Sequence, residues 1–268
     1  MNIQKVLVTP SMAESILSTN KQNRKVRETA ILKFSREMIN GNWKEDTGEL
    51  IKISDSGVLL DGQHRLLALI KANKSIYFHI ANGLNESILP YLDTGNIRTA
   101  GDVFKFNGIH YSTNIPSYIQ QYYMIKNTNG FVVGNKSARL SNSECFKYYN
   151  DCPEFWDMVA GNTSKFYEMF SKALKQSIIG GLYAVFYEID KETANSFFLE
   201  LCSGNNITNK SILILRKKIL DDKISASKRI ILSTKIVYII KTWNYYRTGL
   251  EVSVLKHNSE TENLIKPI

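Results

Sequence analysis

The sequence has few of the residues that build disulfide frameworks or metal sites. Its three cysteines, Cys145, Cys152 and Cys202, cannot all pair with one another, and none of them forms a CxxC pair. The four histidines are scattered along the chain, so no HExxH motif or comparable ligand set occurs. We therefore expect neither a disulfide framework nor a structural zinc ion.

Long apolar runs are also missing. The N-terminal stretch has no apolar run of the kind found in signal peptides, and no window of about 18 uninterrupted apolar residues occurs elsewhere. We therefore expect no membrane span and a cytosolic protein.

The composition is that of a folded, basic protein. Of 268 residues, 43% are hydrophobic and 22% are charged, which is enough apolar material for a sizeable core. Lys and Arg number 34 against 25 Asp and Glu, a formal net charge of +9. That surplus favours a polyanionic partner such as DNA, and it is equally compatible with a merely solubilising coat of lysines.

Hydrophobic periodicity predicts a mixed first part of the chain. The expected elements are a helix from Val26 to Ile39 ended by Gly41, a hairpin of runs 50–53 and 58–60 around Asp55-Ser56-Gly57, a buried helix from His64 to Ala72, a strand from Ser75 to Ala81, and a short helix from Ala100 to Phe106. This order indicates an α/β or α+β domain.

Beyond about Asn107 the pattern becomes helical. Ser141 and Glu144 form a capping box, Thr163 is a second candidate cap, and a long helix is expected from Ile224 to Arg247. We therefore predict an α+β protein with an N-terminal domain over residues 1–110 and a mainly helical domain over residues 111–268. Tyrosines of the helical part, such as Tyr118 and Tyr122, are expected in its core, with stacking on single-stranded bases as the alternative.

The segment Leu59 to Ala68 carries the most chemistry. An apolar strand leads through Gly62 directly into a helix, whose first-turn N–H groups favour an anion. His64 and Arg65 can add donors to a phosphate, and Asp61 is placed to hold a divalent metal, orient His64 or act as a base. In the alternative interpretation, Asp61 only caps the helix and Arg65 only forms a salt bridge.

The run Asp61-Gly62-Gln63-His64-Arg65 resembles the signature of the ParB/sulfiredoxin superfamily, especially ParB-like proteins of phages and mobile elements. Further similarity covers about the first 110 residues and includes the stretches Val8-Thr9-Pro10, Asn23-Arg24, Gly41-Asn42-Trp43, Gly83-Leu84, Asp93-Thr94-Gly95 and Arg98-Thr99-Ala100. The resemblance implies a ParB/sulfiredoxin-like α/β domain that binds ATP or CTP with Mg²⁺.

In such a domain the turn Gly62-Gln63-His64-Arg65 would cradle the phosphates. Asp93, Thr94 and Arg98 are expected to complete the site or, equally, Asp93 pairs with Arg98 while Thr99 caps the following helix. The family pattern, and nothing else in the sequence, implies that Asn23 and Arg24 reach the same pocket. Asp61, His64 and Arg65 are the predicted catalytic residues, and Asp61 is the predicted metal ligand.

The chain departs from two branches of the superfamily. Gln63 stands where sulfiredoxins have their catalytic cysteine, which argues against sulfinic acid reduction, and residues 111–268 show no recognition helix of a centromere-binding protein. The leading hypothesis is a nucleotide-dependent activity on DNA by hydrolysis, phosphoryl transfer or nuclease action. The alternatives are a non-catalytic module that binds DNA or a host protein, such as an anti-defence inhibitor, and a small-molecule kinase.

Overall fold

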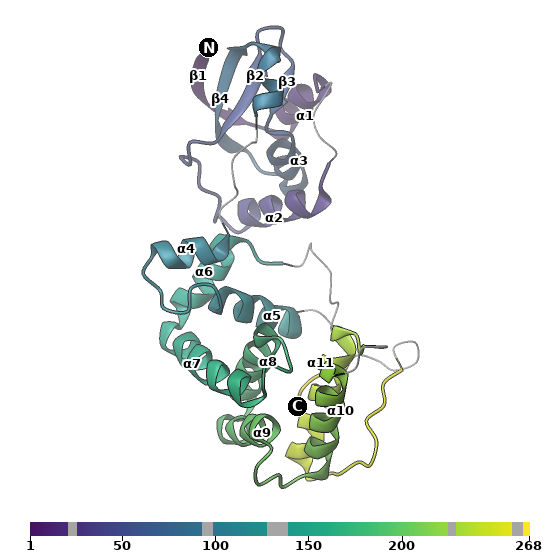
Figure 1. Cartoon of the computed structure of the whole chain (residues 1–268). Helices are drawn as coiled ribbons and strands as arrows, with labels where there is room; N and C mark the ends of the chain where they lie inside the picture. The colour runs from purple at the N-terminus through teal and green to yellow at the C-terminus, as the bar shows by residue number, and fades with distance from the viewer. Residues whose placement is uncertain (21–25, 93–98, 128–138, 225–228, 259–264) are drawn as a thin grey trace. The chain divides into compact units, whose positions relative to one another are not determined.

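The computed structural model describes residues 1–20, 26–92, 99–127, 139–224, 229–258 and 265–268. The chain divides into two compact units, Met1–Ile97 and Arg98–Ile268 (Figure 1). The fold is therefore α+β, with a mixed sheet and helices followed by a mainly helical part. The division lies earlier than the predicted boundary at residue 110, because Phe104 of the short helix packs against Phe146 and Tyr149 of the helical unit.

The first unit is a four-stranded sheet with helices. The sheet has the order β1-β4-β2-β3, in which β4 pairs antiparallel with β1 and parallel with β2, and β2 pairs antiparallel with β3. Its elements are β1 (Asn2–Val8), α1 (Pro10–Ser18), α2 (Glu28–Ile39), β2 (Leu50–Ser54), β3 (Leu59–Asp61), α3 (Gln63–Ala72), β4 (Ile76–Leu84) and the 3₁₀ helix η1 (Glu86–Tyr91).

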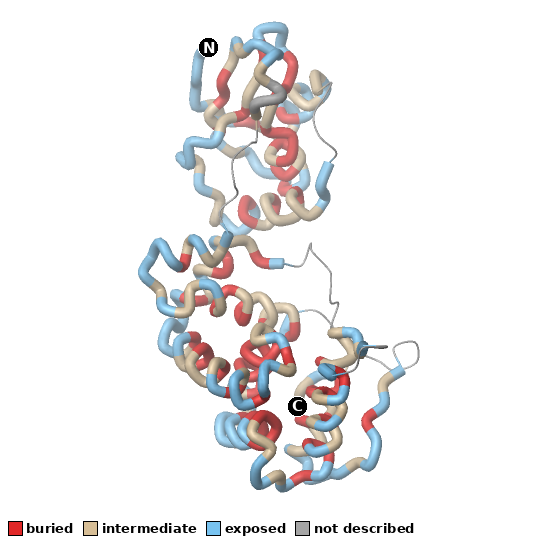
Figure 2. Tube along the Cα trace, viewed as in Figure 1, coloured by how far each residue is buried: buried red, intermediate tan, exposed pale blue. Residues whose placement is uncertain are grey.

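The core of this unit lies between the sheet and the helices. Ile51 of β2 and Phe78 of β4 are buried against Leu66 and Leu69 of α3 and Ile31 of α2. Figure 2 shows buried segments in red in both the sheet and the helices of this unit. The predicted hairpin, buried helix and following strand are all confirmed, within one to three residues at each end. Strand β1 and helix α1 were not predicted.

The second unit is built from helices. They are α4 (Ala100–Phe106), α5 (Ile115–Asn127), α6 (Asn142–Asp151), α7 (Pro153–Met169), α8 (Gln176–Ile189), α9 (Lys191–Ser203), α10 (Lys210–Ile224) and α11 (Leu232–Thr248). Helix α8 is buried along most of its length and lies close to α5, where a Cβ on Gly180 would run into the ring of Tyr118. No helix of the described residues is long and apolar enough to cross a bilayer.

Two expectations for the helical unit are wrong. Thr163 does not cap a helix, because it lies fully buried inside α7, which instead begins with Pro153 after Cys152. The helix predicted from Ile224 to Arg247 is not continuous, since α10 ends at Ile224 and α11 begins at Leu232. The capping box of Ser141 and Glu144 and the terminating Gly249 are confirmed.

Candidate functional site

The turn from β3 into α3 depends on Gly62. This residue is the N-cap of α3, with φ +109° and ψ 2°, a backbone conformation that residues with a side chain rarely adopt. A Cβ at this position would also run into the side chain of Ile51 on the neighbouring strand. Glycine is therefore required for the strand to lead directly into the N-terminus of α3.

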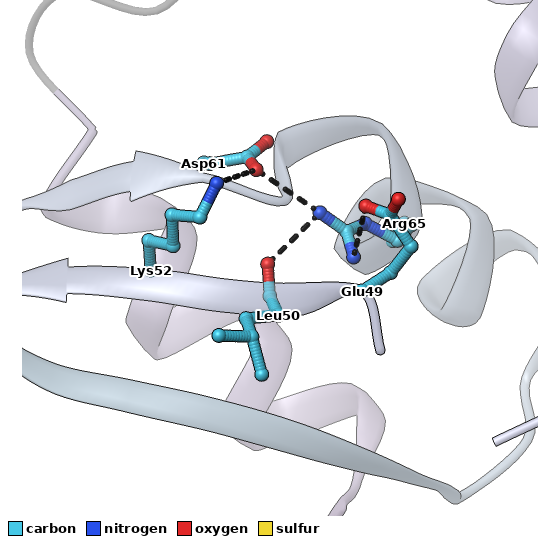
Figure 3. A network of polar contacts seen from close by, with 5 residues as sticks. All are labelled: Glu49, Leu50, Lys52, Asp61 and Arg65. Atoms are coloured by element: carbon cyan, nitrogen blue, oxygen red, sulfur yellow. Dashed lines mark hydrogen bonds and ion pairs between the residues drawn. The ribbon is translucent and has the colours of Figure 1, made fainter. Parts of the chain in front are cut away.

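Arg65 lies in the first turn of α3 and faces the hairpin. Its Nη2 atom donates to the backbone oxygen of Leu50 at 3.0 Å and to Oδ2 of Asp61 at 3.3 Å (Figure 3). The same Oδ2 atom accepts from Nζ of Lys52 at 3.2 Å. These contacts tie β2, β3 and the first turn of α3 together, as the salt-bridge interpretation of Arg65 predicts. The cap expected of Asp61 in that interpretation is wrong, because the N-cap of α3 is Gly62 and no side chain caps the helix.

The group is electrically balanced but leaves one donor of Arg65 without a hydrogen bond. Lys52 and Arg65 face Asp61 and Glu49, whose carboxylate lies 3.8 Å from Nη1 of Arg65. That distance allows an ion pair but not a hydrogen bond. Nη1 is buried and makes no hydrogen bond within the described part of the chain. A buried donor of this kind is costly unless a further acceptor reaches it.

Gln63 and His64 hold the two ends of a basic stretch of sequence. Both side chains are buried. Oε1 of Gln63 accepts from Nδ2 of Asn20 at 2.6 Å, just after α1, and Nε2 of His64 accepts from the backbone N–H of Arg27 at 2.9 Å, just before α2. The chain on either side of residues 21–25 is thereby held at the start of α3.

The contact with Arg27 constrains the chemistry of His64. Because a backbone N–H can only donate, Nε2 of His64 carries no proton while this hydrogen bond exists. Nε2 therefore positions the start of α2 and does not provide the phosphate donor expected from the sequence.

Several predicted site residues lie outside the described residues. They are Asn23, Arg24, Asp93, Thr94 and Arg98. The neighbouring Thr99 is described, and it caps α4: its Oγ1 accepts from the N–H of Asp102 at 3.2 Å, while its own N–H donates to Oδ2 of Asp102 at 2.8 Å. The predicted cap is confirmed, and the roles of the other five residues stay predictions.

The surroundings of Asp61 do not fit its predicted role as a Mg²⁺ ligand. Its Oδ2 atom already faces two cations, Lys52 and Arg65, and a divalent cation at this place would be repelled by both. Among the described residues, no group of three His, Cys, Asp or Glu side chains is arranged to hold a metal ion. We therefore derive no step through a metal bound by Asp61.

The tyrosines considered for base stacking belong to the core. Tyr118, Tyr122 and Tyr149 are buried, and Tyr123 and Tyr148 pack against the same cluster. The core interpretation is therefore confirmed for the buried three.

Sequence reasoning missed four partners of the motif: Asn20, Arg27, Lys52 and Glu49. Of these, Lys52 carried a usable signal, because it stands directly opposite Asp61 in the antiparallel pairing of the predicted hairpin. The contacts of Asn20 and Arg27 join residues about 40 positions apart and leave no local pattern.

In comparisons with known proteins, no family model, curated protein or solved structure matches the chain.

Proposed function

We propose that the N-terminal unit binds the phosphates of a nucleoside triphosphate, ATP or CTP, at the start of α3. The observation that carries this proposal is the pair of contacts from Gln63 to Asn20 and from His64 to Arg27. They hold both flanks of residues 21–25, three of which are Lys or Arg, at the positive end of a helix.

The roles of the motif residues follow from their contacts. Gly62 makes the abrupt turn, and Arg65 has a buried donor, Nη1, with no hydrogen bond among the described residues. Asp61, Gln63 and His64 are positioning residues in this proposal, because each holds another part of the chain. Asn23, Arg24, Asp93, Thr94 and Arg98 remain proposed phosphate contacts, and Mg²⁺ would accompany the nucleotide rather than rest on Asp61.

The proposal extends, on the resemblance to ParB-like proteins of phages and mobile elements, to nucleotide-dependent work on DNA. Hydrolysis, phosphoryl transfer and nuclease action all fit a site that stabilises phosphate charge. The contacts of Asp61, His64 and Arg65 favour none of the three.

Calorimetric titration with ATP and with CTP tests the nucleotide site. Arg24→Gln should weaken binding about tenfold, since a hydrogen bond between charged groups contributes about 1.5 kcal/mol. Lys74→Gln is the matched control, because Lys74 is an exposed lysine of the same unit, and its affinity should equal that of the wild type.

Arg65→Gln should also weaken binding, but Arg65 supports the fold, so its unfolding temperature has to be measured alongside. The proposal is contradicted if the wild type binds neither ATP nor CTP. It is also contradicted if Arg24→Gln and Lys74→Gln bind with equal affinity.

A non-catalytic binding module is the second candidate. It is favoured because the predicted catalytic side chains Asp61, His64 and Arg65 each already have a structural partner within the unit. Turnover separates the two candidates, and it is measured as release of inorganic phosphate from ATP or CTP, transfer of the γ-phosphoryl group to an acceptor, or cleavage of DNA. A module binds nucleotide, DNA or a host protein with none of these reactions, whereas an enzyme carries out at least one of them at a rate that Arg24→Gln lowers and Lys74→Gln does not.

A further inference from the structure

The helical unit contains a cavity of about 440 Å³ with a strongly basic lining. It lies where the end of α7, the start of α8, the end of α10 and the start of α11 meet. Its charged residues are Lys172, Lys175, Lys223, Arg229, Lys235 and Asp222, five cations and a single carboxylate.

The one carboxylate is already neutralised. Oδ2 of Asp222 lies 2.5 Å from Nζ of Lys235, and the carboxylate also accepts the backbone N–H of Ile230. The side chains of Asp222 and Lys235 are only 3% and 14% exposed. This buried pair is part of the lining, and the other four cations form no salt bridge with an acidic residue of the lining.

The remaining four cations of the lining come from the loop before α8, from the end of α10 and from the segment before α11. Lys172, Lys175, Lys223 and Arg229 are exposed. Nζ of Lys223 donates to the backbone oxygen of Ser171, which ties α10 to the loop between α7 and α8. In that loop Ser171 and Lys172 both have positive φ, 51° and 58°. Lys172 also pairs with Glu168 at 3.3 Å, outside the cavity lining.

The start of α8 adds further positive electrostatic potential. Lys175 is the N-cap of α8, no side chain caps the helix, and its first turn contains no acidic residue. The positive end of the helix dipole is therefore not compensated locally.

We propose that this basic cavity is a contact site for the sugar–phosphate backbone of a nucleic acid. This goes beyond the nucleotide proposed for the N-terminal unit and rests on none of its residues. The charge of the whole helical unit supports a long polyanion, rather than a small anion, as the ligand. Residues 98–268 contain 22 Lys and Arg against 15 Asp and Glu, a net charge of +7, whereas residues 1–97 contain 12 against 10.

The exposure of the cations supports the same choice. Exposed lysines on separate elements gain most of their binding energy by releasing counterions from a polyanion, whereas a small anion needs buried, converging donors. The described lining has exposed cations and no such buried cluster.

Fluorescence anisotropy with labelled single- and double-stranded DNA tests the site in the full chain, without added nucleotide and at several salt concentrations. The variant Lys175→Gln/Arg229→Gln should bind about tenfold more weakly at low salt. Its slope of log K against log salt should fall by about 1.5, because each phosphate contact contributes about 0.7 to 0.9.

The control variant Lys105→Gln/Lys147→Gln removes the same charge from exposed lysines of α4 and α6 and should change affinity less than twofold. The proposal is overturned if the wild type binds neither DNA, or if both variants lose the same affinity. It is also overturned if poly-glutamate displaces the DNA as well as unlabelled DNA does. None of these outcomes affects the nucleotide proposal, whose test uses Arg24→Gln.

Discussion

Gly62 is the residue on which the geometry of the candidate site depends most directly. Its φ of +109° and the nearness of Ile51 act together, so alanine is disfavoured both by the backbone and by lack of space. Gly57, in the turn of the hairpin, also has a positive φ, +84°, but an added Cβ would meet nothing within 4 Å. Alanine substitutions at the two positions therefore separate the effect of backbone strain from that of steric overlap.

We predict that Gly62→Ala lowers the free energy of unfolding by about 3 kcal/mol, since strain and overpacking each contribute 1–3 kcal/mol. Gly57→Ala should lower it by only about 1 kcal/mol. Denaturant unfolding followed by circular dichroism measures both. Equal losses for the two variants would show that the space next to Ile51 is not limiting.

Asp222 gives the helical unit a dependence on pH. Burial raises the pKa of its carboxyl, but hydrogen bonds from Lys235 and from the N–H of Ile230, with the charges of Lys235 and Arg229, outweigh burial and bring the pKa below its ordinary value of 3.8. A carboxyl with a lowered pKa in the folded state stabilises the protein above the pKa of the unfolded state. This stabilisation is lost as pH falls through the lower, folded value.

Asp222→Asn should therefore be less stable than the wild type at pH 7, and the difference should shrink as the pH is lowered below about 4. Thermal unfolding of both proteins between pH 7 and pH 3 measures this convergence. A difference that stays constant over the whole range would mean that the charge of Asp222 does not contribute.

At the scale of elements, the sequence predicts two polar residues as helix caps, and only one of them caps a helix. Ser141 caps α6 through its hydroxyl, which accepts from the N–H of Glu144 at 3.1 Å. Thr163 lies fully buried inside α7, and its hydroxyl has no hydrogen-bond partner among the described residues.

Ser141→Ala should lower the free energy of unfolding by about 1 kcal/mol, the usual contribution of a cap. Thr163→Val keeps the shape of the side chain and removes a buried, unsatisfied hydroxyl, so it should leave stability unchanged or raise it. Urea unfolding of the two variants measures both changes in the free energy of unfolding. A clear loss of stability in Thr163→Val would mean that the hydroxyl does have a partner.

Elements with a strong local pattern could be predicted from the sequence, and elements without one could not. The hairpin of β2 and β3 and the helix α3 follow from alternation, turn residues and a glycine between them. Strand β1 is an edge strand in which only Val8 is buried, so its sequence shows little alternation. Helix α8 is buried at every position from Ile178 to Phe186, so no exposed polar face marks its middle in the sequence.

The candidate site could be predicted only in its local part. The turn at Gly62 and the ion pair of Asp61 with Arg65 lie within five residues and follow from the motif. The contacts of Gln63 with Asn20 and of His64 with Arg27 depend on how α1, α2 and α3 pack, which no short pattern encodes. The contact with Arg27 gives Nε2 of His64 a positioning role, and the phosphate contact expected of His64 stays a prediction.

At the scale of the whole molecule, each unit has a hydrophobic core of its own, and α4 belongs to the second. A fragment of residues 98–268 should therefore fold by itself. A fragment of residues 111–268, cut at the boundary expected from the sequence, loses the fully buried Phe104 and should be less stable by about 3 kcal/mol. Equal unfolding temperatures of the two fragments would place α4 outside the core.

The central claim is that a nucleoside triphosphate binds at the start of α3. Amide NMR of the isotope-labelled full chain during titration with ATP, and separately with CTP, tests it most directly. The account predicts that at least one nucleotide produces saturable shifts, with the largest at the amides of residues 62–65. Absence of saturable shifts with both nucleotides, or shifts confined to residues away from this turn, would contradict it.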